Sequence, residues 1–160
     1  MKLIHFIFLA APIFICGCPF ADPDESAIRE MLKSFVASIE RGDEDLGRAC
    51  LLDMDGFNVI NPDVGTRVDA DAYTETVLAE LIHNHRALVT RYEGRTLKLK
   101  VFTVGNVGYQ YKGTQAFLNN RITISVDGTL EELPIKGIVK IGQQWKIVDL
   151  YGILSAGEAY

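Results

Sequence analysis

The clearest pattern in the chain is an apolar stripe with a period of about 3.6 residues that begins after Asp22. Asp22 fits the N-cap of a helix, Pro23 its first position and Glu25 its third, and Gly42 follows the last apolar residue. The pattern predicts a helix from Pro23 to about Arg41 whose apolar face packs against the rest of the domain. The stripe consists of Ile28, Met31, Leu32, Phe35, Val36 and Ile39.

A second, shorter helix is predicted directly after this one. Asp43 is its expected N-cap, and it runs to about Met54 and stops before Gly56. Residues 57–68 then contain Asn, Pro, Asp and Gly, which predicts a loop with room for one short strand.

A third helix follows, capped by Asp69 or by Asp71 and ended by Gly94. Its apolar positions again recur at helical spacing, and one polar side chain, His85, lies among them. The stripe consists of Tyr73, Val77, Leu78, Leu81, Ile82, His85, Leu88, Val89 and Tyr92.

After Thr96 the apolar period changes to about 2, the spacing of a strand with one buried face. Leu97, Leu99 and Val101 alternate with lysines and are expected on the buried side, and Asp127-Gly128 is a hairpin signal. Helices followed by an antiparallel meander define an α+β class, with N-terminal helices packed on one face of the sheet. Strands are predicted over residues 96–104, 107–111, 122–126, 135–141 and 145–151.

The N-terminus has the pattern of a bacterial export signal. Lys2 precedes an apolar run from Leu3 to Ile15, which is shorter than the ~20 residues of a membrane-spanning helix. The run ends in Ile15-Cys16-Gly17-Cys18, which resembles a lipobox, the site where a signal peptidase cuts before a cysteine that carries lipid. We predict a signal peptide over residues 1–17, lipid on Cys18 and a tether over residues 18–24.

This prediction places the protein in the bacterial cell envelope, attached to a membrane through Cys18 and facing the periplasm or the exterior. The lipobox match is incomplete, because Ile15 takes the position of the usual Leu and Cys16 that of a small residue. Secretion with cleavage near Ala21, or an uncleaved anchor, are the alternatives.

Composition excludes one class of partner. The chain has 21 acidic and 16 basic residues and no basic run, so we expect no nucleic-acid binding. If Cys16 leaves with the signal and Cys18 carries lipid, Cys50 is the single remaining cysteine. Its apolar helical context predicts a buried thiol without a disulfide partner.

Residues 25–152 resemble a known family. Two helices, a short strand, a helix and then several strands end in Trp145-Lys146-Ile147-Val148-Asp149-Leu150, and this order is similar to that of the NTF2-like (SnoaL-like) superfamily. The resemblance implies a curved sheet around a long N-terminal helix, with a cone-shaped cavity. Some relatives are isomerases, dehydratases or cyclases, and many are non-catalytic. A generic α+β layer without a cavity is the alternative, and residues 153–160 are expected to form a tail.

Four residues are candidates for the wall of such a pocket. By strand alternation Trp145, Asp149 and Tyr151 share one face, and burial beside Trp145 would raise the pKa of the Asp149 carboxyl. We expect His85 from the third helix to approach the same cavity. The structural alternatives are a core histidine with one hydrogen bond and a solvated aspartate near a strand end.

Neither a metal nor a cofactor is expected. His83 and His85 lie ~200° apart around a helix that turns about 100° per residue, so one metal ion cannot reach both from a shared face. A calcium loop beginning at Asp53 would need Glu at its twelfth position, where the chain has Val64. The chain also lacks the P-loop, dinucleotide and nucleophile-elbow motifs.

Two functional classes remain open. The first is a non-enzymatic, lipid-anchored binding or accessory domain that takes a small apolar ligand or an envelope protein. The second is a small acid–base enzyme of the isomerase or dehydratase type that uses the same pocket. We favour the first class, because the candidate polar residues are few.

Overall fold

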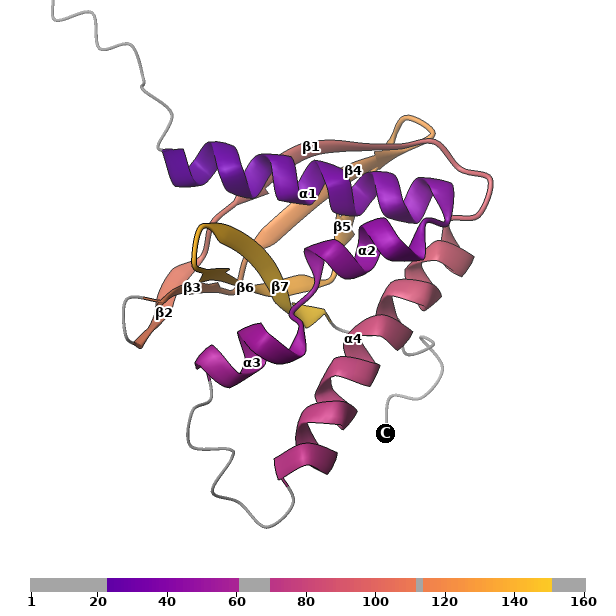
Figure 1. Ribbon diagram of the computed structural model, residues 1–160. Coiled ribbons are helices and arrows are strands. Elements are labelled where there is room, and N and C mark those ends of the chain that lie inside the picture. Colours follow the sequence, from indigo (N-terminus) through magenta and orange to yellow (C-terminus); the bar gives the residue numbers. More distant parts are fainter. Residues whose placement is uncertain (1–22, 61–69, 112–113, 151–160) are drawn as a thin grey trace, which may run out of the picture.

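The computed structural model describes residues 23–60, 70–111 and 114–150, in which a layer of helices packs on curved antiparallel sheets (Figure 1). The predicted signal segment, Cys18, Tyr151 and the predicted tail lie outside these residues. Within the described ranges, no helix is long and apolar enough to cross a membrane. The helices are α1 (Pro23–Arg41), α2 (Glu44–Cys50), α3 (Met54–Ile60) and α4 (Ala70–Arg91).

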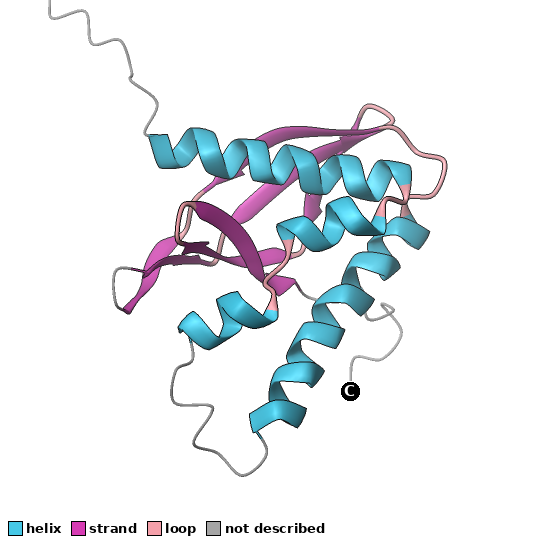
Figure 2. Ribbon diagram, viewed as in Figure 1, coloured by secondary structure: helices cyan, strands magenta, loops and turns pink. Residues whose placement is uncertain are grey.

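The strands form two sheets that follow the helices in the chain (Figure 2). The first sheet has the order β1-β4-β5 and the second the order β2-β3-β6-β7, and neighbouring strands run antiparallel. Helix α1 contacts β1 of one sheet and β7 of the other, and α4 contacts both α1 and β7. The predicted α+β class is confirmed. The strands are β1 (Leu97–Thr103), β2 (Asn106–Tyr111), β3 (Thr114–Leu118), β4 (Arg121–Val126), β5 (Thr129–Leu133), β6 (Ile135–Ile141) and β7 (Gln144–Leu150).

The apolar stripe of α1 forms the centre of the core, as its helical spacing predicts. Its most buried members are at most 3% exposed, and Met31 is partly buried beside them. Because α1 touches both sheets, this single face buries apolar surface against most of the domain, which is the main favourable contribution to folding. The fully buried members are Ile28, Leu32, Phe35, Val36 and Ile39.

The junction between α1 and α2 has the predicted chemistry. Gly42 takes a left-handed backbone angle (φ +65°), which glycine adopts without strain, and α1 ends there. The Asp43 carboxylate accepts a hydrogen bond from the backbone N–H of Leu46 at 2.9 Å and so caps α2. These two residues let the chain reverse within a few positions and place α2 beside α1.

The end of the second helix was predicted wrongly. Helix α2 stops at Cys50, and Leu51 forms an isolated parallel bridge to Ile147 of β7. A separate helix, α3, then contains Gly56, because the Asp53 carboxylate accepts from the Gly56 N–H at 2.8 Å and starts a new helical turn. Residues 57–60 are therefore helical rather than part of a loop.

Two strands, β3 and β5, were missed by the sequence analysis. Strand β3 buries Thr114 and Ala116, a polar and a small side chain, and β5 buries only Leu133 while Leu130 is 65% exposed. Neither segment has the run of large alternating apolar residues from which a strand can be recognised. Their pairing with longer neighbours, β6 and β4, keeps them in the sheets.

A bulge in β1 interrupts the predicted alternation. The register with β4 shifts between Leu99 and Val101, so Leu97 is buried whereas Val101 is 57% exposed. Phe102 turns to the inner side in its place and packs against the core. The expectation that Val101 lies on the buried face is therefore wrong.

Candidate functional site

His85 is buried at the junction of three helices and is 2% exposed. Its Nε2 lies 2.9 Å from the Ser38 hydroxyl of α1, and that hydroxyl donates its hydrogen to the carbonyl of Phe35. Since Ser38 has one hydrogen to give, His85 Nε2 donates to Ser38. The Phe35 ring centroid lies 5.4 Å from that of the imidazole. His85 therefore connects α4 to α1.

Helix α2 packs directly on the other side of the imidazole. A Cβ atom at Gly47 would lie 2.3 Å from Cε1 and 2.4 Å from Nε2 of His85, so only a glycine fits. Burial lowers the pKa of His85, and the nearby Glu44 carboxylate partly opposes that shift. A neutral imidazole with one partner, packed between helices, matches the structural alternative of a core histidine.

Asp149 lies on the opposite face of β7 from Trp145 and Ile147. Ile147 pairs with Ile138 and Asp149 pairs with Gly137, so the register shifts and Val148 is an extra residue. A Cβ at Gly137 would meet Asp149 Cβ at 2.7 Å, which places both on the same side of the sheet. The simple alternation used for the sequence prediction therefore fails at Val148.

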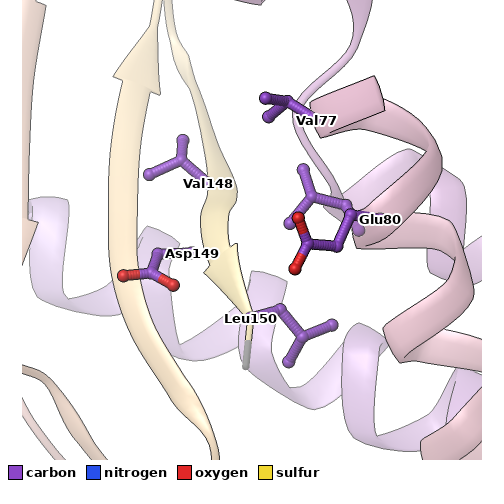
Figure 3. A pocket seen from close by; sticks show the side chains of 6 residues that line it. Val77, Glu80, Val148, Asp149 and Leu150 are labelled. Carbon is purple, nitrogen blue, oxygen red and sulfur yellow. The ribbon is translucent and has the colours of Figure 1, made fainter. Parts of the chain in front are cut away.

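The surroundings of Asp149 form a small cleft between α4 and β7 (Figure 3). Its volume is about 90 Å³, and apolar side chains such as Val77 and Leu81 form most of the wall. Burial raises the pKa of the Asp149 carboxyl, and the charge of Glu80 raises it further. Figure 3 shows Asp149 and Leu150 on opposite sides of β7, with Glu80 on the Leu150 side.

Trp145 occupies a third location. It is 4% exposed, its ring stacks on Phe117 with centroids 5.4 Å apart, and the Lys140 amine lies 5.8 Å from the ring centroid. In the described part of the structure its buried indole N–H has no hydrogen-bond acceptor. Among the four predicted pocket residues, His85, Trp145 and Asp149 are thus not brought into one cavity, and Tyr151 lies outside the described residues.

A groove that the sequence analysis did not predict lies between α1, α2 and the hairpin of β6 and β7. Its volume is about 510 Å³, and Met31, Leu46, Cys50, Trp145, Lys146 and Glu30 are among the residues that line it. Lys146 of β7 is 9% exposed. Its ammonium donates to the carbonyl of Ala49 at 2.7 Å and lies 3.7 Å from an Asp53 carboxylate oxygen.

The sequence contains a partial signal for this groove. Trp145 and Lys146 follow a Gly-Gln-Gln turn, and both are buried because α2 ends beside β7, where Leu51 bridges to Ile147. The position of that helix end depends on the break between α2 and α3, which the residue pattern does not reveal. Cys50 at the same helix end is buried as predicted, and burial raises the pKa of its thiol to about 11.

No group of three or more metal-binding side chains occurs among the described residues. Two of the carboxylates there, those of Asp43 and Asp53, cap α2 and α3. The groove combines apolar side chains with five polar or charged ones: Glu30, Ser34, Gln143, Gln144 and Lys146.

Comparison with known proteins gives similarities in structure. No known family profile matches the sequence, and no curated protein matches it. A protein of unknown function with a cystatin-like fold from Nostoc punctiforme is 12% identical with a TM-score of 0.41, over 78% of this chain and 86% of that one. A protein from Streptomyces avermitilis described as a "putative dehydratase from the NTF2-like family" is 15% identical with a TM-score of 0.41, over 78% and 91%.

A designed NTF2 protein is a third similar structure, with 18% identity and a TM-score of 0.35 over 79% of this chain and 96% of that one. The chain itself has the α+β arrangement that the sequence resemblance implies: helices first, a long α1 across curved antiparallel sheets, and a Trp-containing last strand. The class of protein is thus an α+β domain with N-terminal helices packed on curved antiparallel sheets.

Two aspartates, one on β7 and one in the turn between β4 and β5, provide a test of the electrostatic account. Because the pKa of Asp149 is raised in the folded protein, the ionised carboxylate destabilises the folded state at pH values above the folded pKa. Below the unfolded pKa the carboxyl is protonated in both states, and this destabilisation is absent. Asp149→Asn is therefore expected to raise the free energy of unfolding at neutral pH. The gain should disappear near pH 3, measured by urea unfolding at both pH values.

The matched control is Asp127→Asn, at a turn position where φ is 48° and asparagine is tolerated. Hydrogen bonds from the Thr96 N–H and from Arg95 lower the pKa of Asp127, so its stabilising contribution is present at neutral pH and lost as the pH falls. Asp127→Asn should therefore destabilise at neutral pH. If both variants changed the free energy of unfolding at neutral pH in the same direction, this electrostatic account would be contradicted.

Proposed function

We propose that the protein is a lipid-anchored cell-envelope domain that binds a small apolar ligand in the groove between α1, α2 and the β6–β7 hairpin. The observation that carries this proposal is the groove itself. Its volume of about 510 Å³ lies within the range of ~300–1,000 Å³ that is usual for small-molecule sites. Its walls include the apolar side chains of Met31 and Leu46 and the ring of Trp145, together with five polar or charged residues.

The anchor is supported by the N-terminal sequence, in which Cys18 follows the apolar run of the export signal. Pro23, the start of α1, lies five positions after Cys18, and a chain of that length spans at most ~18 Å. A lipid on Cys18 would therefore keep the beginning of α1 near the membrane. The groove is lined by the N-terminal half of α1, so it would face the region close to the lipid headgroups.

Lipidation is tested by metabolic labelling with a fatty acid. The wild type should incorporate label and fractionate with membranes, while Cys18→Ala should lose the label and its membrane attachment, because the acceptor thiol is gone. Cys50→Ala is the control, since a buried thiol with a pKa of about 11 should not accept lipid. Equal labelling of the wild type and Cys18→Ala would overturn the anchor.

Ligand binding in the groove is tested by blocking it. Ala27 is an exposed residue of α1 on the groove wall, and Ala27→Phe should fill part of the space and reduce photolabelling of the groove by dodecanol that carries a terminal diazirine. Ala79→Phe is the matched control, because Ala79 is an exposed residue of α4 outside the groove. Equal labelling of both variants would contradict binding in the groove.

The acid–base alternative would use Asp149, whose pKa is raised. The cleft beside it holds about 90 Å³, well below the ~300 Å³ of a small-molecule site. Glu80, the other carboxylate on its wall, carries the same charge, and His85 is committed to Ser38 on another part of the domain. The volume of the cleft and the partners of these residues favour the groove over the Asp149 cleft as the binding site.

A further inference from the structure

A further hollow, the aromatic cleft, lies where the first turn of α1 meets the ends of β1 and β3 (Figure 1). Its volume is about 430 Å³. Phe102, Val104 and Phe117 pack against the core on one side but are only partly buried, so apolar surface of each is left uncovered in the cleft. The cleft is lined by Asp24, Glu25, Phe102, Thr103, Val104 and Phe117.

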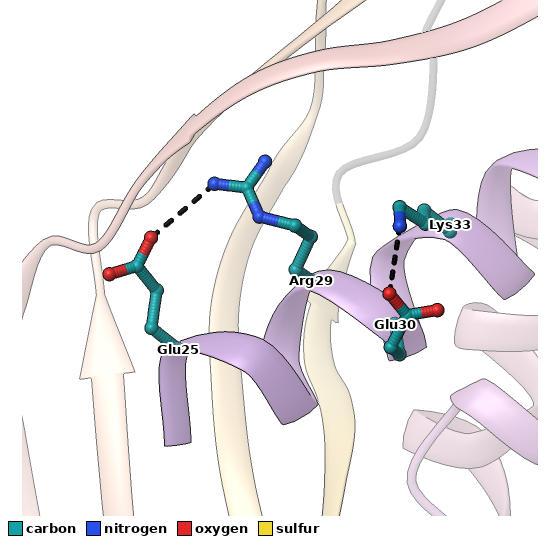
Figure 4. A network of polar contacts seen from close by, with 4 residues as sticks. All are labelled: Glu25, Arg29, Glu30 and Lys33. Carbon is teal, nitrogen blue, oxygen red and sulfur yellow. Dashed lines mark hydrogen bonds and ion pairs between the residues drawn. The ribbon is translucent and has the colours of Figure 1, made fainter. Parts of the chain in front are cut away.

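The two carboxylates on the wall of the aromatic cleft form ion pairs with neighbouring cations. The Lys140 ammonium donates to Asp24 at 2.5 Å, and the Arg29 guanidinium donates to Glu25 at 3.3 Å (Figure 4). Arg29 also lies over the Phe102 ring, 4.8 Å from its centroid. The carboxylates are thus compensated within the domain, and the apolar side chains provide the surface that an occupant would contact.

These walls fit an aromatic side chain. Phe117 already stacks on Trp145 with ring centroids 5.4 Å apart, which holds the Phe117 ring in place. Another ring in the cleft would remove apolar surface from water, and aromatic pairs gain free energy beyond the area that they bury.

The chain itself supplies such a side chain directly before α1. Phe20 is the one aromatic residue in the sequence of the predicted tether, and it precedes Pro23 by three positions. Three residues span at most ~11 Å. Because the two residues after Pro23, Asp24 and Glu25, already belong to the cleft wall, the Phe20 ring can reach the cleft without a rearrangement of the domain.

Prolines at both ends of this short segment lower the entropic cost of docking. Pro19 and Pro23 have a fixed φ angle, and each restricts the residue before it, Cys18 or Asp22, to extended conformations. A segment with fewer conformations before docking loses less entropy when it docks.

We propose that the aromatic cleft is the docking site of the N-terminal tether and that the Phe20 ring packs against Phe102 and Phe117. The inference goes beyond the proposed ligand groove, which is lined by other residues of α1. With lipid on Cys18, docking would leave only two chain positions, at most ~7 Å, between the lipidated residue and the domain. The first turn of α1 would then be held next to the lipid headgroups.

Two other contacts of Phe20 compete with docking in the cleft. The ring would insert into the bilayer if the lipid on Cys18, two positions away, drew it there. It would contact a second copy of the chain if the aromatic cleft were an interface between copies. The experiment must therefore identify what Phe20 contacts.

The test uses the full chain, produced with its signal in a bacterial envelope and reconstituted in phosphatidylcholine vesicles. Phe20→p-benzoylphenylalanine introduces an aromatic photo-crosslinker, and mass spectrometry maps its products. Most crosslinks should fall on peptides that contain residues 102–104 or 117. Ala21→p-benzoylphenylalanine is the matched control, because neighbouring residues of an extended chain point to opposite sides, and its yield in these peptides should be about fivefold lower.

A change in the cleft tests the same contact from the other side. Thr103 is exposed on the cleft wall, so Thr103→Glu adds a charge that a docked ring would have to desolvate. The variant should lower the yield of crosslinks from position 20 to the cleft about fivefold. Thr129→Glu, at an exposed threonine of β5 outside the cleft, should leave this yield unchanged. Circular dichroism checks folding, and the comparison of positions 20 and 21 decides alone if Thr103→Glu does not fold.

Several results would overturn the docking of Phe20. These are equal cleft yields from positions 20 and 21, equal losses in Thr103→Glu and Thr129→Glu, and a mature chain that begins after residue 20. Crosslinks mainly to phosphatidylcholine would place the ring in the bilayer, and crosslinks mainly between two copies would make the cleft an interface between copies. Either of these results overturns the proposal as well.

The failure of the proposed function has a different signature. Cys18→Ala should retain the crosslinks from position 20 to the cleft, because docking depends on the ring and not on the lipid. Absence of lipid on Cys18, or of dodecanol labelling in the ligand groove, would overturn the proposed function and leave the docking of Phe20 intact. Loss of the cleft crosslinks in Cys18→Ala would instead overturn docking, since the membrane and not the cleft would then position the tether.

Discussion

Replacing Phe35 by alanine is expected to lower the free energy of unfolding by ~3–5 kcal/mol, the usual cost of truncating a buried phenylalanine. Phe35 is 0% exposed at the centre of the α1 stripe, and its ring packs against the imidazole of His85 on α4. Truncation removes apolar contacts and leaves a cavity between α1 and α4. Since a domain is typically stable by only ~5–15 kcal/mol, this one change should remove a large part of its stability.

The measurement is urea unfolding followed by the fluorescence of Trp145, the single tryptophan of the chain. Leu130→Ala serves as the control, because Leu130 is 65% exposed on β5 and its truncation should change stability by less than about 0.5 kcal/mol. A loss below about 1 kcal/mol for Phe35→Ala would mean that the α1 face does not form the core.

Much of the fold follows from local patterns in the sequence. The α1 stripe, the Asp43 cap and the left-handed Gly42 depend on residues within one or two turns of each other, so spacing alone reveals them. The division between α2 and α3 was not predicted, because Gly56 suggested an end of helix whereas Asp53 caps a new one. Asp53 and Gly56 fit either the end of one helix or the start of another, so the local sequence does not distinguish these two structures. The contact of Leu51 with β7 is what separates α2 from α3.

The candidate site was harder to predict, because it depends on long-range geometry. Alternation places Asp149 beside Trp145, but the bulge at Val148 moves it to the other face, and one extra residue in a ladder leaves little trace in the sequence. His85 was correctly placed on the buried stripe of α4, yet its partner Ser38 lies 47 positions away. The burial of Lys146 was not predicted, and it follows from the end of α2 against β7.

Gly47→Ala should destabilise the domain by ~1–3 kcal/mol, although helix propensity alone predicts the opposite sign. Gly47 lies within α2, where alanine is normally favoured over glycine by ~0.5–1 kcal/mol. The new Cβ would lie 2.3 Å from Cε1 of His85, a distance that forces the ring or α2 to move. The imidazole is held by Ser38 and Phe35, so the strain from the clash should exceed the gain in propensity.

The double variant with His85→Ala separates these two contributions. Without the imidazole the clash disappears, so Gly47→Ala in the His85→Ala background should be neutral or stabilising by up to ~1 kcal/mol, which is the propensity difference alone. The change of sign between the two backgrounds is the expected result, and urea unfolding of the four proteins in the cycle measures it. If Gly47→Ala stabilises the wild type, α2 does not pack on His85 as closely as the 2.3 Å approach requires.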